Sequence, residues 1–151
     1  MSLRKALVPF DSSSMASELV SFAFRYAANN HLEWIDFFHV WDKKGLGCLV
    51  QRTEKTDVNE ETFRRDFACL VEKVLQDSRQ VDVPHDLIIT YGIPYEEIIN
   101  RAEKEDYQII IIGSQGASNI EKFFIGHVTA KVVRHAPCHV LILRPGKDRF
   151  S

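Results

Sequence analysis

The chain has 151 residues, of which 45% are hydrophobic and 26% are charged, and its net charge at pH 7 is −2. This size and composition predict one soluble globular domain over residues 1–151, ordered from about residue 3 to about residue 145. The charge balance argues against a nucleic-acid-binding surface, and no apolar stretch is long enough to predict a membrane-spanning helix.

The cysteines and the N-terminal pattern indicate a compartment. Cys48, Cys69 and Cys138 are widely spaced and odd in number, which is typical of thiols in a reducing environment rather than of a disulfide framework. The first apolar run, Ala6 to Pro9, is too short for a secretory signal peptide. We therefore expect a cytoplasmic protein.

In the first half of the chain, strand and helix patterns alternate. A short apolar run at residues 6–10 predicts a strand, and apolar residues at helical spacing over 19–27 predict a helix capped by the serines before it. Aromatic and β-branched residues predict a second strand over 34–41. Residues 42–56 have no clear period and are expected to form a surface loop, and a second amphipathic helix follows over 59–78.

The second half continues the alternation. A strand is predicted over 86–91, and a helix begins at Pro94 and runs to about Glu105. Residues 108–113 contain four consecutive isoleucines, which is typical of a central strand covered on both faces. A helix over 126–135 and a last strand over 139–144 complete the order. This pattern predicts an α/β fold, a single-domain open five-stranded parallel sheet with helices on both faces.

A ligand of such a sheet binds beyond the carboxyl ends of its strands. Asp11 follows the first predicted strand, Val40 and Trp41 end the second, and a glycine-containing loop follows the fourth. Trp41 either stacks at the mouth of a pocket or packs as an ordinary core or loop residue.

The glycine loop has the spacing G-x2-G-x9-G, with Gly113, Gly116 and Gly126, and the third glycine opens a helix. Glycine backbone and free helix N-terminal amides can hold an anion such as phosphate. Two glycines after a strand are often only a tight turn, so the spacing by itself is a weak signal and leaves both interpretations open.

Several motifs together resemble the universal stress protein family. The similarity covers most of the chain and is weakest from Asp42 to Asp82. The segments that carry it are Val8-Pro-Phe-Asp11-Ser, Tyr91-Gly-Ile-Pro-Tyr-Glu-Glu-Ile98, Gly113-Ser-Gln-Gly116 with Gly126, Val132-Val-Arg-His-Ala-Pro-Cys138 and Val140-Leu-Ile-Leu-Arg144.

This resemblance implies an adenine nucleotide alpha hydrolase-like sheet with strand order 3-2-1-4-5. It also implies a homodimer through the last strand (Val140, Leu141, Ile142 and Leu143) and binding of ATP, ADP or AMP, with Mg²⁺ bridging the phosphates. In nucleotide-binding members, the acid after the first strand and the hydrophobic residue after the second frame adenine and ribose, while the glycine loop holds the phosphates. The predicted site residues are Pro9, Asp11, Val40, Gly113, Gly116, Gly126, His127 and Val128.

His127 departs from the family pattern, which has a hydroxyl residue at this position. Its ring could donate a hydrogen bond, and an imidazolium would attract phosphate, but the larger side chain could instead fill the pocket. Thr129 lies two residues further into the helix and is expected to point elsewhere. Ala117 stands where the family often has a basic side chain.

No catalytic or metal site is predicted. His135, Cys138 and His139 lie across a helix end, a turn and a strand start, so their side chains need not converge on a metal. The Walker motif for phosphate binding is absent, and Asp11-Ser-Ser-Ser14 lacks the glycines of adenylating pyrophosphatases. The function expected is that of an ATP-binding regulatory protein acting as a dimeric switch in the stress response. The alternatives are a dimeric stress protein that acts through protein contacts without nucleotide, and a slow ATP hydrolase.

Overall fold

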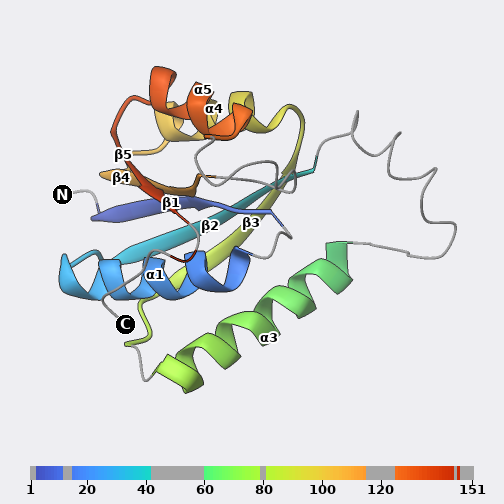
Figure 1. The fold of residues 1–151 in the computed structure, drawn as a ribbon, viewed down its shortest axis with the longest axis vertical. Coiled ribbons are helices and arrows are strands. Elements are labelled where there is room, and N and C mark those ends of the chain that lie inside the picture. The colour runs from blue at the N-terminus through green and yellow to red at the C-terminus, as the bar shows by residue number, and fades with distance from the viewer. Residues whose placement is uncertain are drawn as a thin grey trace, which may run out of the picture.

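The computed structural model describes residues 3–11, 15–41, 60–78, 81–114, 125–144 and 146. The predicted loop over 42–56 and the glycine at position 116 lie outside these residues, as do most of the last seven. The described residues form one five-stranded sheet with helices on both sides of it (Figure 1).

All strand pairings in the sheet are parallel, and the strand order β3-β2-β1-β4-β5 confirms the prediction. The order reverses between β1 and β4, which run side by side at the centre of the sheet. In open α/β sheets this reversal marks the place where ligands bind. The strands are β1 (Lys5–Pro9), β2 (Trp34–Trp41), β3 (His85–Tyr91), β4 (Ile109–Gly113) and β5 (His139–Leu143).

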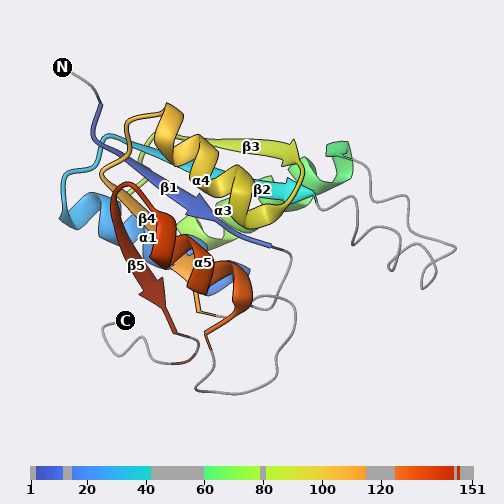
Figure 2. The same cartoon turned by 90° about the horizontal axis from the view of Figure 1, so that it is seen from above.

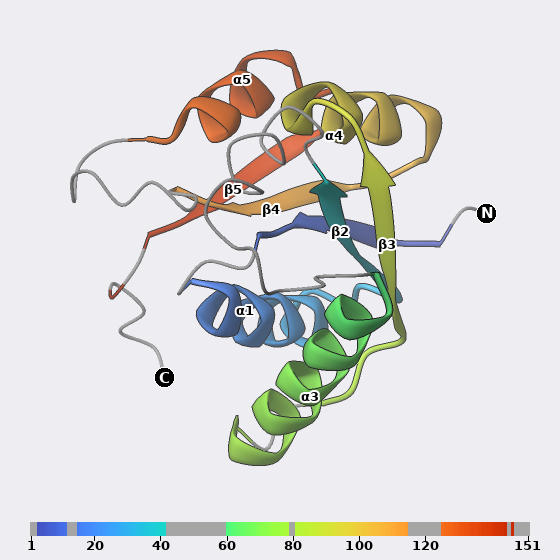
Figure 3. The ribbon, with the colours of Figure 1, turned by 90° about the vertical axis from the view of Figure 1, so that its right-hand side faces the viewer.

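Helices cover both faces of the sheet, as Figures 2 and 3 show. Helices α1 (Ala16–Asn29) and α3 (Glu60–Ser78) lie on one face, and α4 (Pro94–Lys104) and α5 (His127–His135) lie on the other. Pro94 is in the first turn of α4, where its missing N–H costs nothing. The residue before α1 is Met15, whose backbone is already helical; the serines expected to cap this helix lie outside the described residues.

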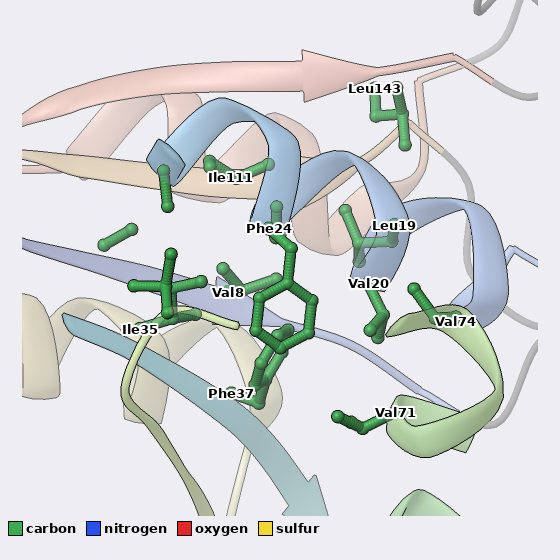
Figure 4. Close-up of a cluster of buried hydrophobic side chains, with 14 of the residues drawn as sticks. Val8, Leu19, Val20, Phe24, Ile35, Phe37, Val71, Val74, Ile111 and Leu143 are labelled. Atoms are coloured by element: carbon green, nitrogen blue, oxygen red, sulfur yellow. The ribbon is translucent and has the colours of Figure 1, made fainter. Parts of the chain in front are cut away.

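The larger core lies between the sheet and helices α1 and α3. Phe24 of α1 and Phe37 of β2 are fully buried at its centre, with ring centroids 5.6 Å apart (Figure 4). Alternate residues of the same strands point to the other face, where Leu7, Phe38 and Ile110 pack under α4 and α5. Among the described helices, none combines the length and the apolar character that a membrane crossing requires.

One carboxylate is buried in the smaller core. Asp36 of β2 is 5% exposed and accepts hydrogen bonds from the Tyr107 hydroxyl at 2.6 Å and from the Trp34 Nε1–H at 2.7 Å. The Arg101 guanidinium lies 3.8 Å from the same carboxylate. Burial and the bond to Asp36 raise the pKa of Tyr107 above its usual value, so the hydroxyl stays protonated and donates.

Side chains occupy the outer edge of β3 at Leu87. The Leu87 N–H donates to Oδ1 of Asp86 at 2.8 Å, and the Leu87 carbonyl accepts from Nη1 of Arg64 on α3 at 2.9 Å. Arg64 is itself held by Glu60, one turn earlier on the same helix. Backbone groups that are satisfied in this way are not free to pair with another strand.

Candidate functional site

A pocket of about 400 Å³ opens at the carboxyl ends of β1, β2 and β4. Its volume lies in the range of small-molecule sites, and its lining is mainly apolar. The first turns of α1 and α4 close its sides through residues such as Leu19 and Ile98. The pocket is therefore at the position where the reversal of strand order predicts a ligand.

The predicted site residues meet at this pocket. Every one that the structure describes lines it, and Gly116 lies outside the described residues. The lining residues among them are Pro9, Asp11, Val40, Gly113, Gly126, His127 and Val128. Segments more than 100 residues apart in the chain are thus brought to one cavity.

One wall of the pocket, here called the strand wall, consists of Pro9, Phe10, Asp11, Phe38, His39 and Val40. It is formed where β1 leaves the sheet beside the end of β2. The Phe10 N–H donates to the Phe38 carbonyl at 3.0 Å, which extends the ladder by one residue beyond β1. The Phe10 ring stacks on Phe63 and Phe67 of α3, with centroid distances of 5.8 and 4.9 Å.

His39 was not predicted from the sequence, yet it lines the strand wall. Its Nδ1 is 2.9 Å from the Phe10 carbonyl oxygen, and because a carbonyl can only accept, Nδ1 carries the proton. The imidazole also stacks on Phe63 with a centroid distance of 4.3 Å. Burial lowers the pKa of His39 despite the opposing effects of the Phe10 bond and the Asp11 charge. The ring is therefore held neutral, in one tautomer.

The opposite wall, the helix wall, consists of Ile112, Gly113, Gly126, His127, Val128 and Thr129. Backbone hydrogen bonds hold it. The Ser114 N–H donates to the Leu143 carbonyl at 2.8 Å, and the Gly126 N–H donates to the Ser114 carbonyl at 2.7 Å. The start of α5 is thereby tied to the end of β4.

Thr129 also belongs to this wall, so the expectation that it points elsewhere was wrong. It is 4% exposed, and its hydroxyl donates to the Gly113 carbonyl at 2.7 Å. The side chain turns back toward β4 because this carbonyl, at the end of the strand, offers a buried acceptor. The Thr129 hydroxyl thus uses its hydrogen in a bond to the backbone, and this bond holds α5 against the sheet.

The N-terminus of α5 faces the pocket. Gly126 precedes the helix and, being a glycine, has no side chain that could cap the first turn by a hydrogen bond. A helix start of this kind offers free N–H groups and a partial positive charge to an anion. His127 is exposed at the rim and leaves the cavity open, so its ring does not fill the pocket.

Two other sequence candidates have structural roles. Trp41 is not among the lining residues; its ring stacks on Tyr91 at 6.1 Å and meets His39 edge-on at 5.8 Å. Cys138 is half-buried, and burial raises its pKa, which keeps it a thiol rather than a nucleophilic thiolate. In the part of the chain that the structure describes, no three metal-ligating side chains gather.

Solved structures share this fold. The universal stress protein UspA from Lactobacillus plantarum matches with a TM-score of 0.74 and 23% identity, covering 95% of this chain and 99% of that one. The structure of protein MJ0577 matches with a TM-score of 0.69 and 26% identity, covering 95% and 96%. The fold is that of the adenine nucleotide alpha hydrolase-like group.

Three further solved universal stress proteins of the same fold are described as complexes with nucleotides. One is bound to cAMP, one from Archaeoglobus fulgidus to dAMP, and one from Arabidopsis thaliana to AMP. Their TM-scores are 0.64, 0.61 and 0.57, and their identities are 17%, 20% and 19%. They cover 95%, 95% and 98% of this chain and 98%, 100% and 96% of their own.

Sequence comparisons agree with the fold. A universal stress protein of Methanothermobacter thermautotrophicus is 35% identical over 143 residues, which cover 93% of this chain and 95% of that protein. Universal stress protein YxiE of Bacillus subtilis is 25% identical over 150 residues, covering 93% and 98%. The model of the universal stress protein family matches residues 2–144. The chain belongs to the universal stress protein family.

Proposed function

We propose that this protein binds an adenine nucleotide in the pocket between the strand wall and the helix wall, and that it acts as a dimeric regulatory switch. The observation that carries the proposal is the meeting of the predicted nucleotide-binding residues at one cavity of about 400 Å³. The nucleotide complexes of the three relatives support it. The free thiols of Cys69 and Cys138 fit a cytoplasmic setting.

Adenine and ribose fit the strand wall. Pro9 and Val40 give an apolar surface on which a flat base can lie, and the fixed backbone beside them can read its polar edge. Asp11 supplies a carboxylate, which accepts hydrogen bonds from ribose hydroxyls. This wall therefore selects the nucleoside.

The phosphates fit the helix wall. The first-turn amides of α5 and the backbone at Gly113 and Gly126 can hold phosphate oxygens, and His127 can donate from the rim. ATP, ADP and AMP share this arrangement, and Mg²⁺ would neutralise part of the charge of the longer phosphate chains. We assign no described side chain to the metal.

For the dimer we propose β5 as the contact. The two edge strands of the sheet are β3 and β5, and Leu87 of β3 has both its backbone groups occupied by side chains. β5 carries the half-buried apolar residues Val140, Leu141 and Ile142 at the opposite edge. A second copy of the chain would cover this apolar edge.

A calorimetric titration tests the nucleotide proposal. Ligand-stripped protein is titrated with AMP, ADP and ATP, each with and without Mg²⁺, and saturable binding near one nucleotide per chain is expected. Val40→Trp should abolish the signal because the indole occupies the pocket. Val133→Trp is the matched control, because Val133 is 48% exposed on α5 and should leave the affinity unchanged.

The two alternative functions, protein contacts without nucleotide and slow ATP hydrolysis, predict different results. If wild-type protein releases no heat and its melting temperature does not move in millimolar ATP, the nucleotide proposal is wrong and protein contacts carry the function. Turnover of ATP well above that of Val40→Trp would identify the slow hydrolase. Light scattering that reports a monomer would contradict the dimer.

A further inference from the structure

The Phe10 carbonyl is the last acceptor of the strand wall before Asp11, where the chain leaves the sheet. The peptide before it is anchored, because the Phe10 N–H is bonded to the Phe38 carbonyl. The carbonyl itself receives Nδ1–H of His39. The backbone on both sides of Phe10 is thus tied to β2, by one backbone bond and one side-chain bond.

The His39 ring, which donates the bond to the Phe10 carbonyl, is also held in place by its neighbours. The His39 ring stacks on Phe63 of α3, and the Phe10 ring lies on Phe63 and Phe67 of the same helix. Burial in this aromatic stack disfavours the charged imidazolium. The ring therefore presents Nδ1–H to the Phe10 carbonyl in one tautomer and one orientation.

We propose that His39 is a positioning residue for the nucleotide: its Nδ1–H fixes the Phe10 carbonyl and thereby holds the adjoining Asp11 carboxylate at the wall of the pocket. The inference deepens the proposed function and rests on it. His39 acts here through the backbone of its neighbour strand, and Asp11 is the group that meets the ribose.

The same histidine chemistry occurs elsewhere in the sheet, which provides a matched control. His85 at the start of β3 also has its Nδ1 2.9 Å from a carbonyl oxygen, that of Val83, and also packs against aromatic rings, including Phe24 at 5.1 Å. It is half-buried like His39, but it does not line the pocket. Replacing either histidine removes a comparable hydrogen bond, and only His39 is next to the site.

The first experiment measures adenosine and AMP affinities of the full chain by calorimetry. His39→Leu removes the donor and leaves the Phe10 carbonyl without its partner, so both affinities should fall about tenfold. In His39→Asn the side-chain amide can take the place of Nδ1–H, and affinity should return to within about threefold of wild type. His85→Leu should bind as wild type does. Equal affinity in His39→Leu and wild type would overturn the inference.

A double-mutant cycle separates positioning from direct contact. If His39 acts through Asp11, then His39→Leu should cost little further affinity once Asp11→Ala has been made. Additive losses would show that His39 touches the nucleotide itself and would also overturn the inference.

Amide hydrogen exchange tests the anchoring of Phe10 in the absence of any nucleotide. The Phe10 amide is bonded to Phe38 and should exchange its hydrogen slowly in wild type, faster in His39→Leu, and at the wild-type rate in His85→Leu. An unchanged Phe10 exchange rate in His39→Leu would contradict the anchoring step. Failure of wild-type protein to bind adenosine or AMP would instead contradict the proposed function.

Discussion

The two walls of the pocket are held together in different ways. In the strand wall, Phe10 and His39 are packed against aromatic rings of α3, and one side-chain hydrogen bond fixes the backbone. In the helix wall, hydrogen bonds to the backbone of Gly113 and Ser114 hold the start of α5. Rings make a rigid apolar surface that suits a base, whereas a tied helix start presents amides that suit an anion. Under the proposed function, nucleoside selection and charge recognition would therefore use separate parts of the chain.

The largest effect is expected from Asp11→Ala in the strand wall. Loss of the carboxylate that we propose accepts from ribose should weaken adenosine and AMP binding by the same factor, about 10- to 100-fold. Calorimetric titrations with the two ligands measure this, and Asp86→Ala on the outer edge of β3 is a control away from the pocket. If only AMP affinity fell, Asp11 would act on the phosphate rather than on the ribose, and the proposed division of roles between the two walls would be wrong.

A smaller effect is expected from Thr129→Val in the helix wall. The substitution keeps the shape of the side chain but removes the donor to the Gly113 carbonyl, so the free energy of unfolding should fall by about 1 to 2 kcal/mol. AMP affinity should weaken by about threefold while adenosine affinity is unchanged, because the start of α5 loosens. Denaturant melts and titrations check this. Thr129→Ser retains the hydroxyl and should restore both quantities; equal weakening of both ligands in Thr129→Val would contradict the prediction.

The smallest effect is a change in the pH dependence of the free energy of unfolding, and it is expected only for a substitution in the strand wall. The pKa of His39 is lowered by burial, so the unfolded chain binds more protons than the native protein below the ordinary histidine pKa of about 6.5. The stability due to neutral His39 is therefore present above that pH and is lost as pH falls through the folded pKa. Urea melts at a series of pH values should show a shallower acid loss for His39→Asn than for wild type. Thr129→Val should keep the wild-type pH slope, since no titrating group has changed.

The strand order could be predicted from the family resemblance, and the chemistry at the strand ends from the sequence pattern. Asp11, Val40 and Gly113 each follow or end an apolar strand run, and parallel strands bring their carboxyl ends to one edge. The central strand was predicted because four isoleucines in succession are typical of a strand covered on both faces. Periodicity and family motifs therefore placed the pocket.

The hydrogen bonds inside the walls could not be predicted, because they depend on register between distant segments. His39 meets Phe10 across 29 residues of chain, and only the pairing of β1 with β2 sets that meeting. In sequence, His39 is one polar residue in an aromatic strand. Thr129 was misplaced for a similar reason, since its acceptor on β4 is 16 residues earlier in the chain.

The side chains bound to Leu87 at the edge of β3 have a consequence for larger assemblies. A sheet that could accept a strand at both edges would grow without limit, and copies of the chain could stack edge to edge into a filament. At Leu87 the edge is closed to such pairing, because Asp86 and Arg64 have already taken its amide and its carbonyl. If copies meet through β5, as proposed for the dimer, pairing at that edge alone gives an assembly that closes at two copies. The Arg64 side chain thus blocks one position of the β3 edge from a residue that lies 23 positions earlier in the chain.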